Sequence, residues 1–163
     1  MSTPSGLKVG LIKPHLEYAD ELYQLIASSR EHLSKFAWAA ALDLAGVKQF
    51  ISSAKGLCLI RINHDKIVGC LEFRDMPNEY TQQVGYWIGK DYAGQGIMKQ
   101  ALSLGVCSGF IDQRLFACIK EDNKASAAVL HSNGFVEGEH VDGWVTYRRI
   151  VGRPRIDPWL IVG

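Results

Sequence analysis

The stretch Gln82-Gln83-Val84-Gly85-Tyr86-Trp87-Ile88-Gly89-Lys90-Asp91-Tyr92-Ala93-Gly94-Gln95-Gly96-Ile97-Met98 decides the fold of this chain. Its first half predicts a short apolar strand, and the loop that follows carries two glycines one residue apart. This loop runs directly into an amphipathic pattern that predicts a helix. Backbone N–H groups at the start of a helix have no helical partners and attract anions. The junction therefore predicts a binding site for a phosphate or pyrophosphate group.

Two common phosphate-binding motifs do not fit this loop. A P-loop requires Gly-Lys-Ser/Thr, and no such triplet follows Gly96. The dinucleotide-binding fingerprint requires a third glycine, but Met98-Lys99 stands in its place, and no acidic ribose ligand follows a second parallel strand. Because paired glycines also mark ordinary tight turns, the rest of the chain has to identify the ligand.

Size and composition indicate one ordinary globular domain over residues 1–163. Apolar residues make up 47% of the chain and charged residues 21%, which is usual for a folded domain. The formal net charge is +1, from 18 basic and 17 acidic residues. A nucleic-acid-binding protein needs a concentrated basic surface, so this balance argues against nucleic acid as a partner.

The cysteines and the N-terminal segment favour a cytoplasmic protein. Cys58, Cys70, Cys107 and Cys118 are far apart and form no metal-binding or disulfide pattern, so we expect buried, reduced thiols and no metal site. Residues 1–6 lack the apolar core of a signal peptide, and no apolar run reaches the length of a membrane span. We therefore expect no membrane association.

Hydrophobic periodicity predicts a regular order of strands and helices. The predicted strands are residues 7–12, 57–63, 67–73, 83–88, 115–119, 135–141 and 144–150, and the predicted helices are 15–28, 30–35, 43–54, 97–110 and 124–132. The apolar composition of residues 115–119 predicts a strand buried on both faces. The order indicates a mixed α/β (α+β) architecture, with helices covering a mostly antiparallel sheet.

A second motif follows the strand at 115–119. It reads Asn123-Lys124-Ala125-Ser126, then Val129-Leu130, then Asn133-Gly134-Phe135-Val136-Glu137-Gly138. Together with the Gly-Tyr-Trp strand and the glycine loop, this segment resembles the GNAT N-acetyltransferase superfamily, most closely its RimJ/RimL branch of ribosomal-protein N-terminal acetyltransferases. The likeness is strong over about residues 67–150 and reaches more loosely back to Leu7. It implies direct transfer of an acetyl group from acetyl-CoA to an amine.

The resemblance also implies where the cofactor binds. In such folds the strand at 84–89 splays from its parallel neighbour at 115–119 and opens a cleft. The backbone of Trp87 and Ile88 would pair with the pantetheine arm, because an unpaired strand edge offers donors and acceptors to an amide-bearing ligand. The pyrophosphate would bind the backbone amides of Gly94, Gln95, Gly96, Ile97, Met98 and Lys99. Asn123 would bind the cofactor or position the substrate amine.

The likeness also suggests candidates for the catalytic residues. Many superfamily members carry a tyrosine four residues before Gly-Phe that protonates the departing thiolate, and here that position is Leu130. Ser126, one helical turn earlier, is a candidate to replace this tyrosine as the acid, as is a bound water. Alternatively, a serine at this position only caps or packs the helix. Glu72 is the best candidate for the general base, although an exposed carboxylate at the end of a strand is the alternative reading. Glu79 is a weaker candidate for the base.

Three functions stay open at this point. The branch likeness favours a protein N-terminal α-amine, of the ribosomal type, as acceptor. A small amine such as a polyamine or an antibiotic is a second acceptor class. A non-catalytic acyl-CoA-binding regulatory module is the third reading, because the usual tyrosine is missing. The sequence does not distinguish a monomer from a homodimer.

Overall fold

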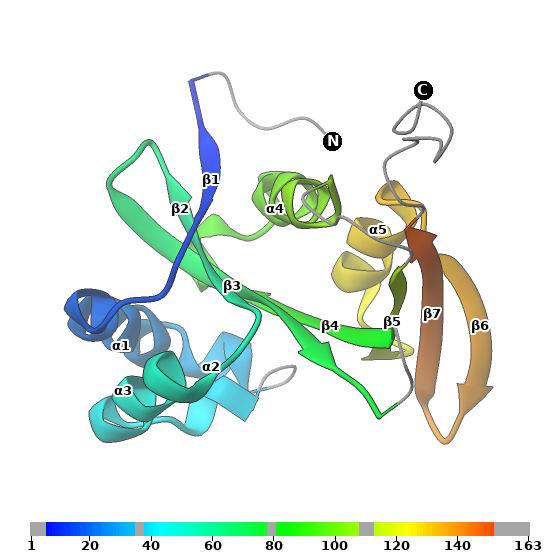
Figure 1. The fold of residues 1–163 in the computed structure, drawn as a ribbon, viewed down its shortest axis with the longest axis horizontal. Helices are drawn as coiled ribbons and strands as arrows, with labels where there is room; N and C mark the ends of the chain where they lie inside the picture. The colour runs from blue at the N-terminus through cyan, green and yellow to red at the C-terminus, as the bar shows by residue number, and fades with distance from the viewer. Residues whose placement is uncertain (1–5, 35–37, 78–80, 108–112, 152–163) are drawn as a thin grey trace, which may run out of the picture.

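The structure is a computed structural model that describes residues 6–34, 38–77, 81–107 and 113–151 (Figure 1). Its strands are β1 Val9–Ile12, β2 Leu57–Ile62, β3 Lys66–Asp75, β4 Thr81–Ile88, β5 Gln113–Lys120, β6 Val136–Val141 and β7 Trp144–Val151. Its helices are α1 Ala19–Ser28, α2 Arg30–Leu33, α3 Leu44–Ser53, α4 Ile97–Cys107 and α5 Lys124–Ser132, with short 3-10 turns η1 Leu16–Tyr18, η2 Trp38–Ala41 and η3 Lys90–Tyr92. The predicted order of elements is confirmed.

The strands form one seven-stranded sheet in the order β1-β2-β3-β4-β5-β7-β6. Neighbouring strands are antiparallel throughout, with the exception of the parallel pair β4 and β5. The conformation of the turn residues explains two of the hairpins in this sheet. Asn63 and His64, between β2 and β3, and Asp142 and Gly143, between β6 and β7, have the left-handed conformation that tight hairpin turns require. The predicted mostly antiparallel sheet is confirmed.

The parallel pair β4 and β5 separates soon after it begins. Residues 81–83 of β4 pair with residues 114–116 of β5, and no further pairing joins the two strands. β4 nevertheless continues to Ile88 and β5 to Lys120. The edge of β4 that faces β5 is therefore without a strand partner over residues 84–88, which confirms the predicted splay. An open strand edge of this kind offers backbone hydrogen bonds to a ligand.

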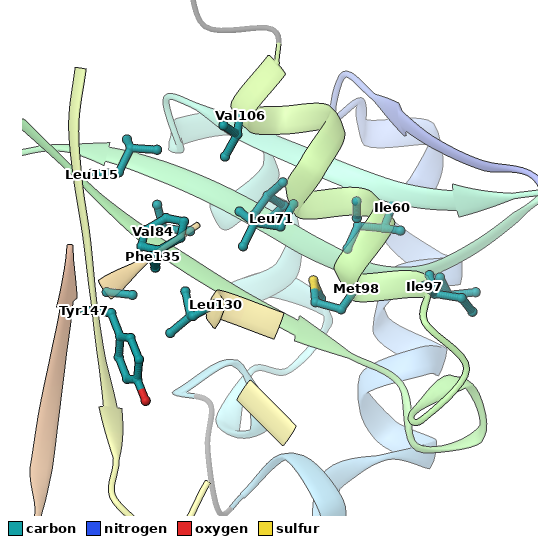
Figure 2. Packing of buried hydrophobic residues seen from close by; sticks show 14 of the residues in the cluster. Ile60, Leu71, Val84, Ile97, Met98, Val106, Leu115, Leu130, Phe135 and Tyr147 are labelled. Carbon is teal, nitrogen blue, oxygen red and sulfur yellow. The ribbon is translucent and has the colours of Figure 1, made fainter. Parts of the chain in front are cut away.

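Two clusters of buried apolar side chains hold the layers together. The first lies between the sheet and the helices α4 and α5, and it includes Leu71, Leu102 and Leu130 (Figure 2). The second lies on the other face of the sheet, where α1 and α3 contribute Leu22 and Val47. Because each face of the sheet around β2, β3 and β4 is covered, these central strands are fixed firmly in place.

Helix α4 lies unusually close to the sheet at Gly105. A Cβ atom at this position would lie 2.9 Å from side-chain atoms of Leu71 and Phe73. A glycine therefore allows the helix backbone to approach the sheet, and a larger residue would require the Leu71 and Phe73 side chains or the helix to shift. The position of α4 matters for function because its first residues follow directly from the glycine loop.

The N-terminal helices differ from their predicted bounds. The predicted helix 15–28 begins as the 3-10 turn η1, so that the α-helix proper starts at Ala19. The predicted helix 30–35 ends at Leu33 within the described residues, and Lys35 lies outside them. Residue 43, the first of the predicted helix 43–54, is the N-cap of α3, since the Asp43 carboxylate accepts a 2.7 Å hydrogen bond from the Gly46 N–H. The predicted end of α4 at Phe110 lies outside the described residues.

The prediction that strand 115–119 is buried on both faces is wrong. Leu115 and Ala117 are buried against the first apolar cluster, but Arg114 and Cys118 are exposed. Helices cover this part of the sheet on one face only, so successive side chains of β5 alternate between core and surface. The sequence of the strand does not reveal this alternation, because Cys118 counts as an apolar residue although its side chain faces outward.

The prediction of buried thiols holds for Cys70 and fails for Cys118. Among the described cysteine side chains, Cys70 is buried, Cys58 is half-buried and Cys118 is exposed. Desolvation raises the pKa of the Cys70 and Cys58 thiols, so both are protonated at neutral pH. No helix in the described ranges is long and apolar enough to cross a membrane.

The hairpin of β6 and β7 carries an exposed network of charged side chains. His140 lies between two carboxylates, with its Nδ1 2.8 Å from Glu121 and its Nε2 2.7 Å from Glu137. The second Glu137 oxygen accepts a 3.3 Å hydrogen bond from the Tyr147 hydroxyl. The hydrogen bonds with Glu121 and Glu137 raise the pKa of His140, and the hydrogen bond from His140 lowers the pKa of Glu137.

We expect this network to tie the hairpin to the loop before α5 most strongly between about pH 4.5 and 6.5. The pKa of His140 is raised on folding, so its contribution is complete below its ordinary value near 6.5 and is lost as the pH rises through the folded value. The pKa of Glu137 is lowered on folding, so its contribution is present above about 4.5 and is lost as the pH falls further. Amide exchange of β6, followed by NMR across this pH range, measures the effect. Identical profiles for the wild type and His140→Gln would contradict it.

Candidate functional site

The glycine loop has the backbone geometry that the sequence predicts. Gly94 and Gly96 have left-handed φ values of 76° and 78°, which glycine adopts without strain. Helix α4 follows directly, and its first helical hydrogen bond runs from the Gln100 N–H to the Gly96 carbonyl at 3.2 Å. The N–H groups of residues 97–99 therefore precede any helical acceptor and are available to an anion at the positive end of the helix.

The side chains of this loop have separate tasks. Ile97 and Met98 are buried in the first apolar cluster and anchor the start of α4 to the sheet. The Gln95 side chain donates a 2.9 Å hydrogen bond to the Asp91 carbonyl and so braces the loop. Any ligand contact from these three residues would therefore come from the backbone. Lys99 is half-buried at the rim of the site, where its positive charge adds to the helix terminus.

A pocket of about 380 Å³ extends from the glycine loop along β4 and α5. It brings together most of the predicted cofactor-binding residues, namely Trp87, Ile88, Gly94, Gly96, Ile97, Met98, Lys99 and Asn123. Gln95, the remaining predicted residue, does not line it. His32 and Leu33 of α2 close the pocket from the other side. We call it the donor pocket.

A second pocket of about 230 Å³ lies on the other side of the splayed strands. Gly85 of β4 forms part of its floor, and a Cβ atom there would meet nothing within 4 Å. The charged side chains that line it are Glu72, Arg74 and Lys120. We call it the acceptor pocket.

Four residues line both pockets, and they mark the point where the two meet. They are Tyr86, Trp87, Asn123 and Ser126. Tyr86 and Trp87 come from the splayed part of β4, whereas Asn123 and Ser126 come from the start of α5. The junction therefore lies between the two strands that separate, at the one place that is reached from both sides.

The Tyr86 hydroxyl is bonded to Ser126 across this junction. It lies 2.7 Å from the Ser126 Oγ and 3.2 Å from the Ser126 carbonyl oxygen. Burial raises the pKa of Tyr86 well above its ordinary value, although the hydrogen bond with Ser126 acts in the opposite direction. The phenol is therefore neutral at physiological pH and retains a proton to donate.

Asn123 caps helix α5. Its side-chain oxygen accepts a 3.1 Å hydrogen bond from the Ser126 N–H, which satisfies one of the free donors of the first turn. This bond uses the oxygen, so the amide nitrogen remains as a donor at the junction of the pockets. The cap also fixes the first turn of α5, from which the Ser126 side chain projects. In this way Asn123 positions the Ser126–Tyr86 pair.

Glu72 lies in the acceptor pocket and not in the donor pocket. Its carboxylate forms a 3.0 Å ion pair with Arg74, and 14% of its side chain is exposed. Glu72 is paired across the sheet with Gly85, so both face the same pocket. Among the three predicted catalytic residues, the structure thus brings Ser126 and Asn123 together, with Glu72 on the acceptor side. The weaker candidate, Glu79, lies outside the described residues.

Sequence reasoning did not identify Tyr86 as a functional residue. The side chain does pack against the first apolar cluster, but its hydroxyl reaches α5, 40 residues further along the chain. A contact between such distant positions leaves no local pattern, although the alternation of β4 does separate Tyr86 from Trp87. Leu130, which occupies the place of the missing tyrosine, is completely buried in the core and cannot take part in proton transfer.

Comparisons with known proteins agree with this geometry. The family model described as an acetyltransferase (GNAT) domain matches residues 8–136. The ribosomal-protein-serine acetyltransferase of Escherichia coli (strain K12) is 34% identical over 77 residues, which cover 44% of this chain and 42% of that protein.

Two solved structures have the same fold over most of their length. The microcin C7 self-immunity acetyltransferase MccE, in complex with acetyl-CoA and AMP, is 25% identical with a TM-score of 0.74, over 88% of this chain and 93% of that one. RimL, the ribosomal L7/L12 α-N-protein acetyltransferase in complex with coenzyme A, is 22% identical with a TM-score of 0.75, over 90% and 96%. The predicted fold and the predicted likeness to the RimJ/RimL branch are both confirmed. The chain belongs to the GNAT family of acetyltransferases.

Proposed function

We propose that this protein transfers the acetyl group of acetyl-CoA to the α-amine at the N-terminus of a protein of the ribosomal type. The observation that carries the proposal is the junction of the donor and acceptor pockets at Tyr86 and Ser126. Two substrates that enter from opposite sides would meet there. The similarity to a ribosomal-protein-serine acetyltransferase supports the acceptor class.

The glycine loop, the start of α4 and the open edge of β4 give the donor pocket the backbone groups that acetyl-CoA would need. A Cβ atom at Gly94 would meet nothing within 4 Å, so the loop is open to a ligand that approaches its backbone. The free N–H groups of residues 97–99 and the Lys99 side chain would hold the pyrophosphate. The open edge of β4 at Trp87 and Ile88 would pair with the amides of the pantetheine arm.

Acetyl-CoA supplies an acetyl group activated as a thioester. During transfer the amine nitrogen forms a bond to the carbonyl carbon, the carbon–sulfur bond breaks, the amine loses a proton and the sulfur gains one. An α-amine with a pKa of about 7.7 is roughly one-sixth neutral at pH 7, whereas a lysine with a pKa of about 10.4 is only about 0.04% neutral. An N-terminal acceptor therefore needs only a modest base.

The residues of the junction divide the proton transfers between them. Glu72, in the acceptor pocket, accepts the amine proton directly or through water. Ser126 donates its hydroxyl proton to the departing sulfur. The Tyr86 hydroxyl lies 2.7 Å from the Ser126 Oγ and 3.2 Å from the Ser126 carbonyl oxygen. In the proposed step Tyr86 turns its proton to the Ser126 Oγ, which directs the Ser126 O–H toward the junction and compensates the charge left on its oxygen.

Acetyl transfer to a panel of acceptors tests the proposal. Peptides with a free N-terminal amine are expected to be acetylated faster than N-terminally blocked peptides that carry lysine, and faster than polyamines. Thiol release measures the rate, and mass spectrometry of the product locates the acetyl group. Transfer to small amines alone would identify a small-molecule acetyltransferase. Tight binding of acetyl-CoA with no transfer to any acceptor would identify a regulatory module, and either result would overturn the proposal.

A further inference from the structure

Within the described residues, no helix covers one face of the sheet at β5 and β7. Leu115 and Ala117 of β5, like Val145 and Tyr147 of β7, are buried on the side of α4 and α5. Side chains alternate along a strand, so the residues between them face the other way. In Figure 1 the helices α1, α2 and α3 gather at the β1–β3 end of the molecule, and β6 and β7 form the opposite end. The outward side chains of β5 and β7 are left at the surface.

These outward side chains form a surface that we call the basic face. Its charged and aromatic members are Arg114, Phe116 and Lys120 of β5 with Trp144 and Arg148 of β7, and Cys118 and Thr146 lie between them. The strand register brings them together, because Phe116 pairs with Arg148 and Lys120 pairs with Trp144. The three cations are exposed, as is 45% of Trp144.

Positive charge on this face is not neutralised by neighbours. Among the described residues, no acidic side chain forms an ion pair with Arg114, Lys120 or Arg148. The Glu72 carboxylate, which lines the acceptor pocket, is already bound to Arg74. Glu137 belongs to the other face, where it bonds with Tyr147 and His140. The chain as a whole carries a net charge of only +1, so this concentration is local.

Apolar groups lie among the cations. The Lys120 Nζ is 5.8 Å from the centre of the Trp144 ring, so the cation and the aromatic surface are presented together. Val136 of β6 pairs with Arg148 and is 70% exposed, which extends the apolar surface to the edge strand. Exposed apolar groups flanked by cations are typical of a surface that binds an acidic protein segment with apolar side chains.

The basic face continues directly from the acceptor pocket. Lys120 and Trp144 line that pocket, whereas Arg114 and Arg148 lie beyond it along the strands. Lys120 lies six positions after Arg114 in β5, which corresponds to roughly 20 Å of strand. An extended chain that starts with its amine at the junction would cover this distance in about six residues.

We propose that the basic face binds an acidic segment of the acceptor protein, which follows its N-terminal amine within about the first ten residues. This inference rests on the proposed function, because it assigns the acceptor pocket to a polypeptide. It adds the chemistry of the acceptor, namely carboxylates after the first few residues, with at least one apolar side chain placed against Trp144.

Charge reversal tests the inference. The variant Arg114→Glu/Arg148→Glu changes two residues that line neither pocket, and Lys48→Glu/Lys66→Glu makes the same change of net charge at exposed positions of α3 and β3. The substrates are two peptides with the same first three residues, one continued by Asp and Glu and the other by Asn and Gln. We expect the first variant to lower kcat/KM for the acidic peptide about tenfold and to leave the neutral peptide unchanged. The second variant should match the wild type on both.

Binding is measured separately from chemistry, by fluorescence anisotropy of the labelled peptides in the presence of CoA. Loss of the preference for the acidic peptide in Arg114→Glu/Arg148→Glu supports the inference even if neither peptide is acetylated, a result that would overturn the proposed function alone. Equal loss of the preference in both variants would overturn the inference. So would stronger binding of an RNA oligonucleotide than of the acidic peptide, or a wild-type dimer by light scattering that Arg114→Glu/Arg148→Glu dissociates.

Discussion

Gly96→Glu is expected to raise the dissociation constant for acetyl-CoA by about 100-fold, which corresponds to roughly 3 kcal/mol. Two effects add to this value. Gly96 has a φ of 78°, and a side chain in this left-handed region costs about 1–2 kcal/mol. A carboxylate about 4 Å from a phosphate adds repulsion of about 1 kcal/mol or more, depending on its exposure to water. Isothermal titration calorimetry measures the change.

Two further variants separate these effects. Gly96→Ala introduces the strain without the charge, so it should weaken binding by about tenfold. Gly143→Glu introduces the same side chain at a φ of 84° in the turn between β6 and β7, away from the donor pocket, and a Cβ atom there meets nothing within 4 Å. It should bind acetyl-CoA as the wild type does. Unchanged affinity in Gly96→Glu would show that the phosphates bind elsewhere.

Ser126→Ala is expected to lower kcat by about 100-fold with little change in the KM for acetyl-CoA, because loss of a proton donor costs at least this factor. The helix cap should survive, since Asn123 binds the backbone N–H of residue 126 and not its side chain. Tyr86→Phe removes the hydroxyl that orients Ser126, and a loss of about tenfold in kcat is expected for one hydrogen bond. Stopped-flow measurement of thiol release gives both values.

The identity of the leaving group distinguishes proton donation from a structural role. An acetyl thioester of a more acidic thiol departs without needing a proton, so the Ser126→Ala defect should shrink toward wild-type activity with such a donor. Ser52→Ala is a matched control, because its hydroxyl bonds only to a helix carbonyl in α3. It should behave as the wild type with either donor. A defect of the same size with both thioesters would exclude Ser126 as the acid.

Local chemistry made much of the fold predictable. Asp43 caps the start of α3 with a side-chain hydrogen bond, and Asn133-Gly134 follows the end of α5. Asp142-Gly143 forms the turn of the last hairpin, because both residues have the left-handed conformation that this turn requires. The glycine loop was predictable for the same reason. These signals depend on a few consecutive residues, so a single sequence contains them in full.

Long-range placement was less accessible. The exposure of Cys118 depends on which face of β5 the helices cover, and residue type alone does not reveal it. The bond between Tyr86 and Ser126 depends on the angle at which two strands diverge, and no local pattern encodes it. The resemblance to a known family supplied Ser126 and Asn123 as candidates, but the partner of Ser126 became visible only in three dimensions.

The short pairing of β4 with β5 has a mechanical consequence. In the described part of the chain, three consecutive residue pairs are the only strand pairing between the β1–β4 part of the sheet and the β5–β7 part. Backbone cohesion between these parts is therefore low compared with that inside each. A ligand that contacts both α4 and α5 links the two parts of the sheet. Its binding free energy then also resists separation of the two parts, and at 100 times its dissociation constant it adds about 2.7 kcal/mol to the free energy of unfolding. We therefore expect the relative motion of the two parts of the sheet to be smallest when such a ligand is bound.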